Sequence, residues 1–176
     1  MLLHGLFGAL SNFSDLIERF RKTNKVVVPL LPLFDLDILH TSVTGLAKYV
    51  DQFIEHKGYD HIHLLGNSLG GHVALVHVLK HPEKIKSLTL TGSSGLFENA
   101  MGDSYPKRGD YDYIKNKTAL TFYDPAMATK ELVDEVFEIT KNRVKVIKII
   151  ALAKSAIRNN LGEELNQIQI PTLLIW

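Results

Sequence analysis

Short hydrophobic runs alternate with segments of helical period along most of the chain. The runs at 25–30, 62–65, 88–90 and 171–176 are rich in Val, Ile, Leu and Thr, and residues 1–4 resemble the end of a fifth run. Continuous apolar runs of this length are typical of strands buried on both faces of a sheet. Strands that alternate with helices predict an α/β fold with a doubly wound, mostly parallel sheet of about five strands and right-handed crossovers.

Three helices are predicted between these strands. Residues 14–20 and 72–79 have apolar positions at helical spacing. Between them, Thr41 or Ser42 is suited to cap a helix that ends at Gly58. That helix presents one apolar stripe, formed by Val43, Leu46, Val50 and Phe53.

The alternation stops after residue 96 and resumes only near residue 167. Two amphipathic helices are predicted within this interval, one at 130–140 behind a Thr129 cap and one at 143–158. A helical insertion between two sheet strands predicts a lid or cap, and such insertions lie over the carboxyl edge of the sheet, where ligands bind.

The expected organisation is therefore a core interrupted by a cap. Residues 1–96 form the first part of the core, 97–166 form the helical cap, and 167–176 form the strand that returns to the sheet. The chain shows no internal repeat and no low-complexity segment.

One motif carries candidate chemistry. The segment Gly66-Asn67-Ser68-Leu69-Gly70-Gly71 directly follows a predicted strand and directly precedes a predicted helix, so it places G-x-S-x-G in a strand–turn–helix context. The turn must be so tight that Ser68 is strained and a side chain at position 66 or 70 would collide with a neighbouring element. Ser68 is therefore the candidate nucleophile. An ordinary βα turn remains the alternative, whereas the spacing does not fit a phosphate-binding loop.

A second glycine-flanked turn, His4-Gly5-Leu6-Phe7-Gly8, follows the first strand. A nucleophile at a strand–helix turn needs a second backbone N–H donor from another loop, and this turn is able to supply one. We expect the Leu6 and Leu69 N–H groups to form an oxyanion hole, with Phe7 as the alternative to Leu6. His4 is expected to order its loop rather than to act as a base.

These motifs resemble the α/β-hydrolase superfamily, and within it the capped esterases, epoxide hydrolases and C–C bond hydrolases. The opening residues 2–13 look like the oxyanion loop of that family, 66–71 like its nucleophile elbow, and 92–96 like the strand end at which its cap departs. The resemblance implies that Phe7, Asn67 and Phe97 contact substrate. It implies no metal and no cofactor.

The resemblance also implies an acid and a histidine after the serine, in that order. All eight histidines lie at or before His81, so no histidine follows in the second half of the chain. We therefore expect the chain to be truncated at both ends, with the catalytic acid and His outside residues 1–176. Asp35, Asp37 and His40 are the in-chain group that could substitute, although a loop and helix start explain them better.

The composition of the chain limits the partners, the cysteine chemistry and the location that we expect for it. The chain has 20 Lys and Arg against 19 Asp and Glu, spread without a basic block, which favours neither nucleic acid nor an anionic membrane as partner. It has no cysteine, which excludes a disulfide framework, a thiolate nucleophile and Cys-type metal sites. No leader-like opening and no long apolar run are present, so a soluble, cytoplasmic protein is expected.

The predicted function is a portion of a serine hydrolase that cleaves a small ester or a related carbonyl substrate. A non-catalytic binding module on the same scaffold is the alternative. Because elements that would cover the sheet are expected to be missing, self-association over exposed core surface is also predicted.

Overall fold

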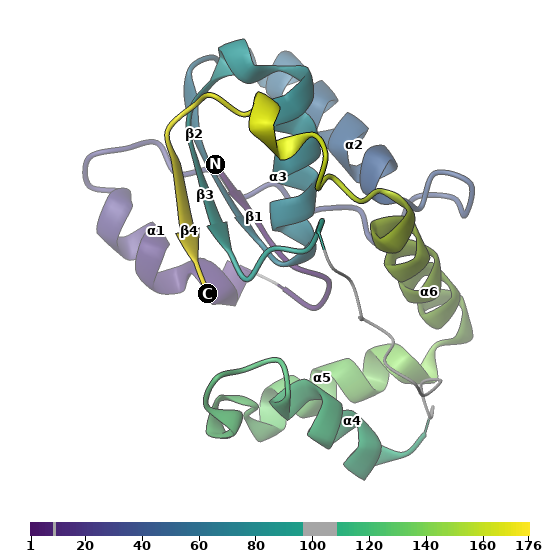
Figure 1. Ribbon diagram of the computed structural model, residues 1–176. Helices are drawn as coiled ribbons and strands as arrows, with labels where there is room; N and C mark the ends of the chain where they lie inside the picture. Colours follow the sequence, from purple (N-terminus) through teal and green to yellow (C-terminus); the bar gives the residue numbers. More distant parts are fainter. Residues whose placement is uncertain (9, 97–108) are drawn as a thin grey trace. The chain divides into compact units, whose positions relative to one another are not determined.

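The computed structural model describes residues 1–8, 10–96 and 109–176 (Figure 1). Contacts divide the chain into two compact units, one formed by Met1–Glu98 with Ala151–Trp176 and the other by Asn99–Ile150. The helices and strands are, in chain order, β1 (Leu2–Leu3), α1 (Ser14–Phe20), α2 (Val43–Lys57), β2 (Ile62–Asn67), α3 (Leu69–Lys80), β3 (Ile85–Thr91), α4 (Tyr111–Ala119), α5 (Lys130–Lys141), α6 (Arg143–Arg158) and β4 (Thr172–Ile175).

The first unit is built on a parallel sheet. Its four strands lie in the order β1-β2-β3-β4, and each neighbouring pair is parallel. Helices α2 and α3 cover one face, and α1 lies on the other (Figure 1). Leu3, Leu64, Leu88 and Leu90 join the side chains of α2 and α3 in one buried core. The predicted α/β architecture is confirmed.

The strand expected at 25–30 is not formed, so the prediction of about five strands is corrected to four in the described sheet. The segment is joined to the sheet by the hydrogen bond from Leu2 N–H to the Val27 carbonyl, at 2.9 Å. Pro29 and Pro32 follow closely and have no N–H to donate to a ladder. The β-branched residues in this run were therefore not sufficient to predict a strand, because two prolines lie within or shortly after it.

Helix α2 begins and ends where its sequence predicts. The Ser42 hydroxyl accepts a hydrogen bond from Gly45 N–H at 3.0 Å, and Gly58 ends the helix in the left-handed conformation with φ 61°. Its buried positions, which include Leu46, Val50 and Ile54, pack into the core. This fixes the helical layer that supports α3.

The second unit contains α4, α5 and the first half of α6 among its described residues. The Tyr111 hydroxyl donates to Asp134 at 2.7 Å, and the Tyr111 ring packs edge-on against Phe137, which fastens α4 to α5. Helix α5 is capped by Thr129 as predicted. Helix α4 was not predicted, although the Asp110 side chain caps it by accepting from Tyr113 N–H.

The compact second unit is shorter than the 97–166 segment expected for a cap. The second half of α6 and the turn after it belong to the first unit, where Leu152, Ala156 and Leu161 are buried in the core. The Ser155 hydroxyl also accepts a hydrogen bond from Val43 N–H at the start of α2, at 3.0 Å.

A buried histidine of α3 contacts an aspartate of α2. His77 is 1% exposed and its Nδ1 lies 2.5 Å from an Asp51 carboxylate oxygen. Its Nε2 has no hydrogen-bond partner among the residues that the structure describes. The pKa of His77 is lowered, first by burial and further by the charges of His81 and Lys84, although Asp51 acts in the opposite direction. The folded protein therefore holds this ring neutral where an unfolded histidine would take up a proton.

We expect the free energy of unfolding to fall as the pH drops below about 6.5, because the unfolded chain binds a proton that folded His77 rejects. The limit for one proton is about 1.4 kcal/mol per pH unit. Urea denaturation between pH 5 and 7.5 measures the slope, which should flatten in His77→Gln. The exposed His40 is the control, and a His77→Gln slope as steep as that of wild type and His40→Gln would contradict the prediction.

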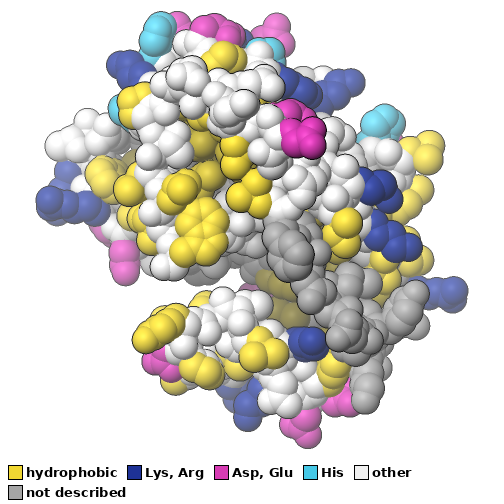
Figure 2. Space-filling view, viewed as in Figure 1, with side chains coloured by type: hydrophobic (Ala, Val, Ile, Leu, Met, Phe, Trp, Pro, Cys, Tyr) yellow, Lys and Arg dark blue, Asp and Glu magenta, His cyan; other side chains and the backbone are white. Residues whose placement is uncertain are grey.

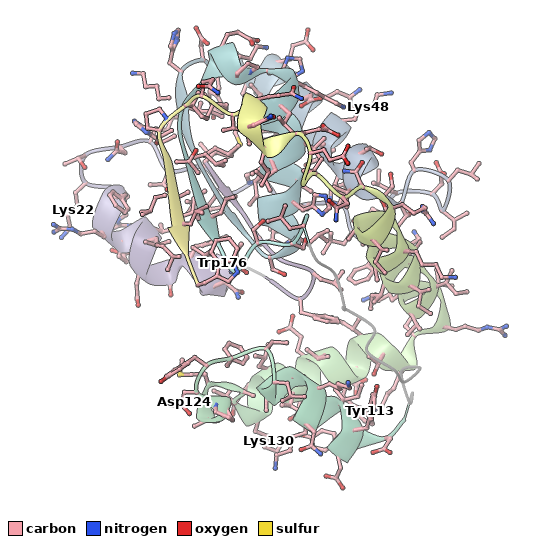
Figure 3. The ribbon with its side chains drawn as sticks, viewed as in Figure 1. Lys22, Lys48, Tyr113, Asp124, Lys130 and Trp176 are labelled. Atoms are coloured by element: carbon pink, nitrogen blue, oxygen red, sulfur yellow. The ribbon has the colours of Figure 1, made fainter. Side chains whose placement is uncertain are left out.

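Strand β4 leaves hydrophobic side chains uncovered at the sheet edge. Leu173, Leu174, Ile175 and Trp176 are 50–74% exposed. Figure 2 shows hydrophobic side chains gathered where β4 lies in Figure 1, and Figure 3 places Trp176 at the end of that strand. A cavity of about 550 Å³ also opens between α1 and the same sheet, lined by residues of α1, β1, β2 and β3.

Self-association over this surface stays a prediction. An uncharged edge strand with exposed side chains is a template for pairing with another chain. We expect sedimentation velocity to show the mass of the chain 1–176 rising with concentration, and Leu174→Lys to reduce that rise. A monomer at all concentrations would contradict the prediction.

Candidate active site

Ser68 stands alone between β2 and α3, at the point where the chain turns sharply. Its backbone has φ 52° and ψ −120°, a conformation that non-glycine residues adopt only at a cost. Its N–H donates to the Thr91 carbonyl at 3.1 Å, and its carbonyl accepts from Gly71 and His72 at the start of α3. The side chain is half-buried and makes no capping hydrogen bond to the helix.

Glycines let this turn pack directly on other backbone. A Cβ at Gly66 would lie 2.5 Å from the Gly70 carbonyl oxygen, and a Cβ at Gly70 would lie 2.2 Å from that of Leu3. These distances are far below van der Waals contact. The collisions predicted for positions 66 and 70 are therefore real, the first with the start of α3 and the second with the end of β1.

The loop after β1 runs against the serine. A Cβ at Gly5 would lie 3.2 Å from the Ser68 Cβ, and Gly8 N–H donates to the Gly5 carbonyl at 3.0 Å. His4 is buried beneath this turn, where its Nδ1–H donates to the Gly5 carbonyl and its Nε2 accepts from Leu31 N–H. Both ring nitrogens of His4 are thus used to order the loop.

The N–H groups expected to form an oxyanion hole belong to two residues, Leu69 directly after Ser68 and Leu6 in the loop after β1. Leu69 is the first residue of α3, so its N–H belongs to the positive end of the helix dipole. Leu6 directly follows Gly5, which reaches Ser68. Phe7, the alternative donor and expected substrate contact, is half-buried in the same turn.

Asn67 and Phe97 are the other two residues expected to contact substrate. The Asn67 side-chain amide donates to the Thr91 carbonyl at 3.1 Å and lies 2.9 Å from the Thr91 hydroxyl, so it holds the ends of β2 and β3 together. Its Oδ1 faces Gly5. Phe97 lies outside the described residues.

The elbow also rests on a residue that the sequence did not identify. Ser94 N–H donates to the Ser68 carbonyl at 3.2 Å, which ties the segment after β3 to the candidate nucleophile. The run of small residues that directly follows β3 could have drawn attention to Ser94. Its contact with Ser68 could not be predicted, because that contact depends on the order of the strands in the sheet.

The histidines near the elbow point to other partners. His72 is fully buried and its Nε2–H donates to the Asn159 carbonyl at 2.8 Å. His63, on β2, lies with Nδ1 2.7 Å from the Ser87 hydroxyl.

The acidic loop before α2 behaves as a local turn. The Asp37 carboxylate accepts from Leu39 and His40 N–H groups and lies 2.8 Å from His40 Nδ1. The hydrogen bond with His40 holds the pKa of Asp37 below its usual value. These contacts are those of a loop and the start of a helix, which is the interpretation that the sequence favoured for Asp35, Asp37 and His40.

Metal ligands do not gather in the described part of the chain. Over residues 1–8, 10–96 and 109–176, no group of three His, Asp or Glu side chains is placed to hold a metal ion. Within those residues no helix is long and apolar enough to cross a membrane.

Comparison with known families agrees with this geometry. Residues 1–127 match the family model described as alpha/beta hydrolase fold. The chain belongs to the α/β-hydrolase family. The resemblance expected from the elbow and the opening loop is thereby confirmed at the level of the family.

Relatives of this α/β hydrolase include enzymes with different named reactions. The chain is 30% identical over 164 residues to Monoacylglycerol lipase abhd6-B of Xenopus laevis. The matched region covers 77% of this chain and 46% of that protein. It is 26% identical to a 2-hydroxy-6-oxononadienedioate/2-hydroxy-6-oxononatrienedioate hydrolase of Klebsiella pneumoniae, covering 74% of this chain and 50% of that protein. The chain thus spans about half the length of these curated relatives.

A solved structure is similar over nearly the whole α/β-hydrolase chain. MGS-MChE2, an alpha/beta hydrolase enzyme from the sediment metagenome of the Mar Chica lagoon in Morocco, is 40% identical with a TM-score of 0.77. The match covers 99% of this chain and 65% of that one.

The strain at Ser68 predicts an unusual stability order. We expect Ser68→Gly to have a free energy of unfolding about 1 kcal/mol above that of Ser68→Ala, because glycine adopts positive φ without a Cβ clash. Urea denaturation of the two variants measures the difference. A Ser68→Ala protein as stable as Ser68→Gly would mean that the turn is relaxed.

Proposed function

We propose that this chain is part of a serine hydrolase that cleaves a small ester or a related carbonyl substrate. Ser68 is the nucleophile, and the Leu6 and Leu69 N–H groups stabilise the oxyanion of the tetrahedral intermediate. The observation that carries the proposal is a strained serine whose hydroxyl makes no capping bond, next to two glycine-shaped backbone turns.

The remaining members of the triad are proposed to lie outside residues 1–176. His4 is committed to its own loop and His72 donates to Asn159, so neither nearby ring is placed to take the serine proton. Relatives about twice as long leave room for an acid and a histidine. The chain 1–176 alone is therefore expected to show weak turnover or none.

The insertion is proposed to shape the substrate pocket, with Phe7, Asn67 and Phe97 as contacts. The relatives are named for a monoacylglycerol and for 6-oxo dienedioates and trienedioates, compounds that all contain a carbonyl group. A carbonyl substrate is therefore the shared feature that we carry over. No cofactor is part of the proposal.

A fluorophosphonate probe tests the proposal on the longest natural chain that contains residues 1–176. We expect one covalent adduct, mapped by mass spectrometry to Ser68 and abolished in Ser68→Ala. Ser87→Ala, which changes a serine on the middle of β3, should label normally. A natural chain that binds no probe would favour the non-catalytic binding module instead.

A further inference from the structure

Two short segments of the first unit lie side by side, one before the chain enters the second unit and one after it returns. Residues 94–96 lead out of the sheet and 159–161 lead back from α6, and we call these two segments the stem. Leu161 N–H donates to the Gly95 carbonyl at 2.8 Å, and the Asn160 side-chain amide donates to the Leu96 carbonyl. The stem is therefore a hydrogen-bonded pair rather than two independent connections.

His72 of α3 touches both segments of the stem. Its Nε2–H donates to the Asn159 carbonyl at 2.8 Å, and its Nδ1 lies 3.4 Å from the Ser94 hydroxyl. Gly95 passes so close that a Cβ there would lie 3.2 Å from the ring carbon Cδ2. Because the ring is fully buried, these contacts are made without competition from water.

The same histidine belongs to the first turn after Ser68. His72 N–H and Ser94 N–H each donate to the Ser68 carbonyl, both at 3.2 Å. One carbonyl thus joins α3 to the outgoing segment, and the His72 ring joins α3 to the returning segment. The ring closes a path of hydrogen bonds from Asn159 to the backbone of the candidate nucleophile.

We propose that His72 is a positioning residue that fixes the stem against the nucleophile turn. The proposal rests on the proposed function, because it assigns His72 a part in holding Ser68 in its strained conformation. A bond to each segment means that neither is able to shift without displacing the ring. His72 would then set where the inserted segment departs relative to Ser68, and its own ring would take no proton from substrate.

The hydrogen bonds also fix the state of the ring. A carbonyl oxygen only accepts, so Nε2 carries a proton, and Nδ1 faces the Ser94 hydroxyl. Two conservative variants separate these contacts. Glutamine places an amide donor near the Nε2 position and keeps the bond to Asn159, whereas asparagine is too short and reaches only the Nδ1 position.

Amide hydrogen exchange, read by NMR on the chain 1–176, tests the anchoring directly. The reporters are the N–H groups of Leu161 and Ser94. We expect exchange at Leu161 to be about tenfold faster in His72→Asn and to stay within about threefold of wild type in His72→Gln. The ring nitrogens of wild-type His72 should show the Nε2–H tautomer.

A matched control separates this role from general loosening of α3. His77→Gln changes another buried histidine of the same helix, and it should leave exchange at Leu161 and Ser94 unchanged relative to amides elsewhere in α3. Equal acceleration in His72→Gln and His72→Asn, an equal effect of His77→Gln, or an Nδ1–H tautomer would each overturn the proposal.

A second readout concerns Ser68 itself, in the longest natural chain. We expect the rate of fluorophosphonate labelling to fall about tenfold in His72→Asn and to recover in His72→Gln. Unchanged labelling in a His72→Asn protein with a loosened stem would refute the positioning role. Absence of labelling in wild type would instead count against the serine hydrolase, and exchange alone would then decide whether His72 anchors the stem.

Discussion

Gly70→Ala is expected to lower the free energy of unfolding by about 3 kcal/mol or more, the upper range for forcing an atom into a packed interior. The added methyl group would lie 2.2 Å from the Leu3 carbonyl oxygen and 2.6 Å from that of His4. Both atoms belong to the backbone at the end of β1, so no side chain is able to rotate out of the way. Relief requires α3 to move from the sheet, which breaks the core around Leu3 and Val73.

Gly58→Ala is the matched control. Gly58 has φ 61° but nothing within 4 Å of its added Cβ, so alanine there should cost only about 1 kcal/mol of backbone strain. Urea denaturation of the chain 1–176 measures both variants against wild type. A Gly70→Ala protein no less stable than Gly58→Ala would mean that α3 and β1 are not in the contact described.

The second large effect concerns turnover. In the longest natural chain, Ser68→Ala is expected to reduce kcat for a short p-nitrophenyl ester by about 10⁴-fold or more, because the acyl-enzyme cannot form without the hydroxyl. KM should change little, since the oxyanion donors and the pocket remain. Steady-state kinetics with a burst measurement checks both parameters.

Ser68→Ala is expected to lose activity without losing its folded structure. Alanine keeps the Ser68 backbone strain and removes a hydroxyl that makes no capping bond, so the folded state should persist. Circular dichroism and the Ser87→Ala protein provide the controls for folding and for loss of an unrelated serine. Residual kcat above one per cent of wild type would assign the nucleophile elsewhere.

The sharp turn at Ser68 was predictable because its constraints are local. Gly66, Ser68 and Gly70 lie within five positions, between a strand and a helix that hydrophobic period alone locates. The positive φ of Ser68 and the close backbone contacts of the two glycines follow from that spacing. The same holds for α2, whose Ser42 cap and Gly58 end are both local signals.

Features that depend on tertiary partners were not predictable in the same way. The run 25–30 has the composition of a strand, but strand pairing depends on a neighbour and on N–H groups that Pro29 and Pro32 lack. Helix α4 buries little more than Ile114 and Thr118, so its hydrophobic period is weak. The contact of His72 with Asn159 joins residues far apart in sequence, and no spacing rule reports it.

The hydrogen bond between Gly95 and Leu161 has a consequence for how this fold diversifies. Because this bond joins the two ends of the excursion, an excursion of different length is able to replace it without separating the strands that hold Ser68. Chimeras that exchange the residues between Gly95 and Leu161 with the equivalent excursion of a relative should therefore preserve the parallel sheet. Evolution is able to vary the two halves of such an enzyme separately.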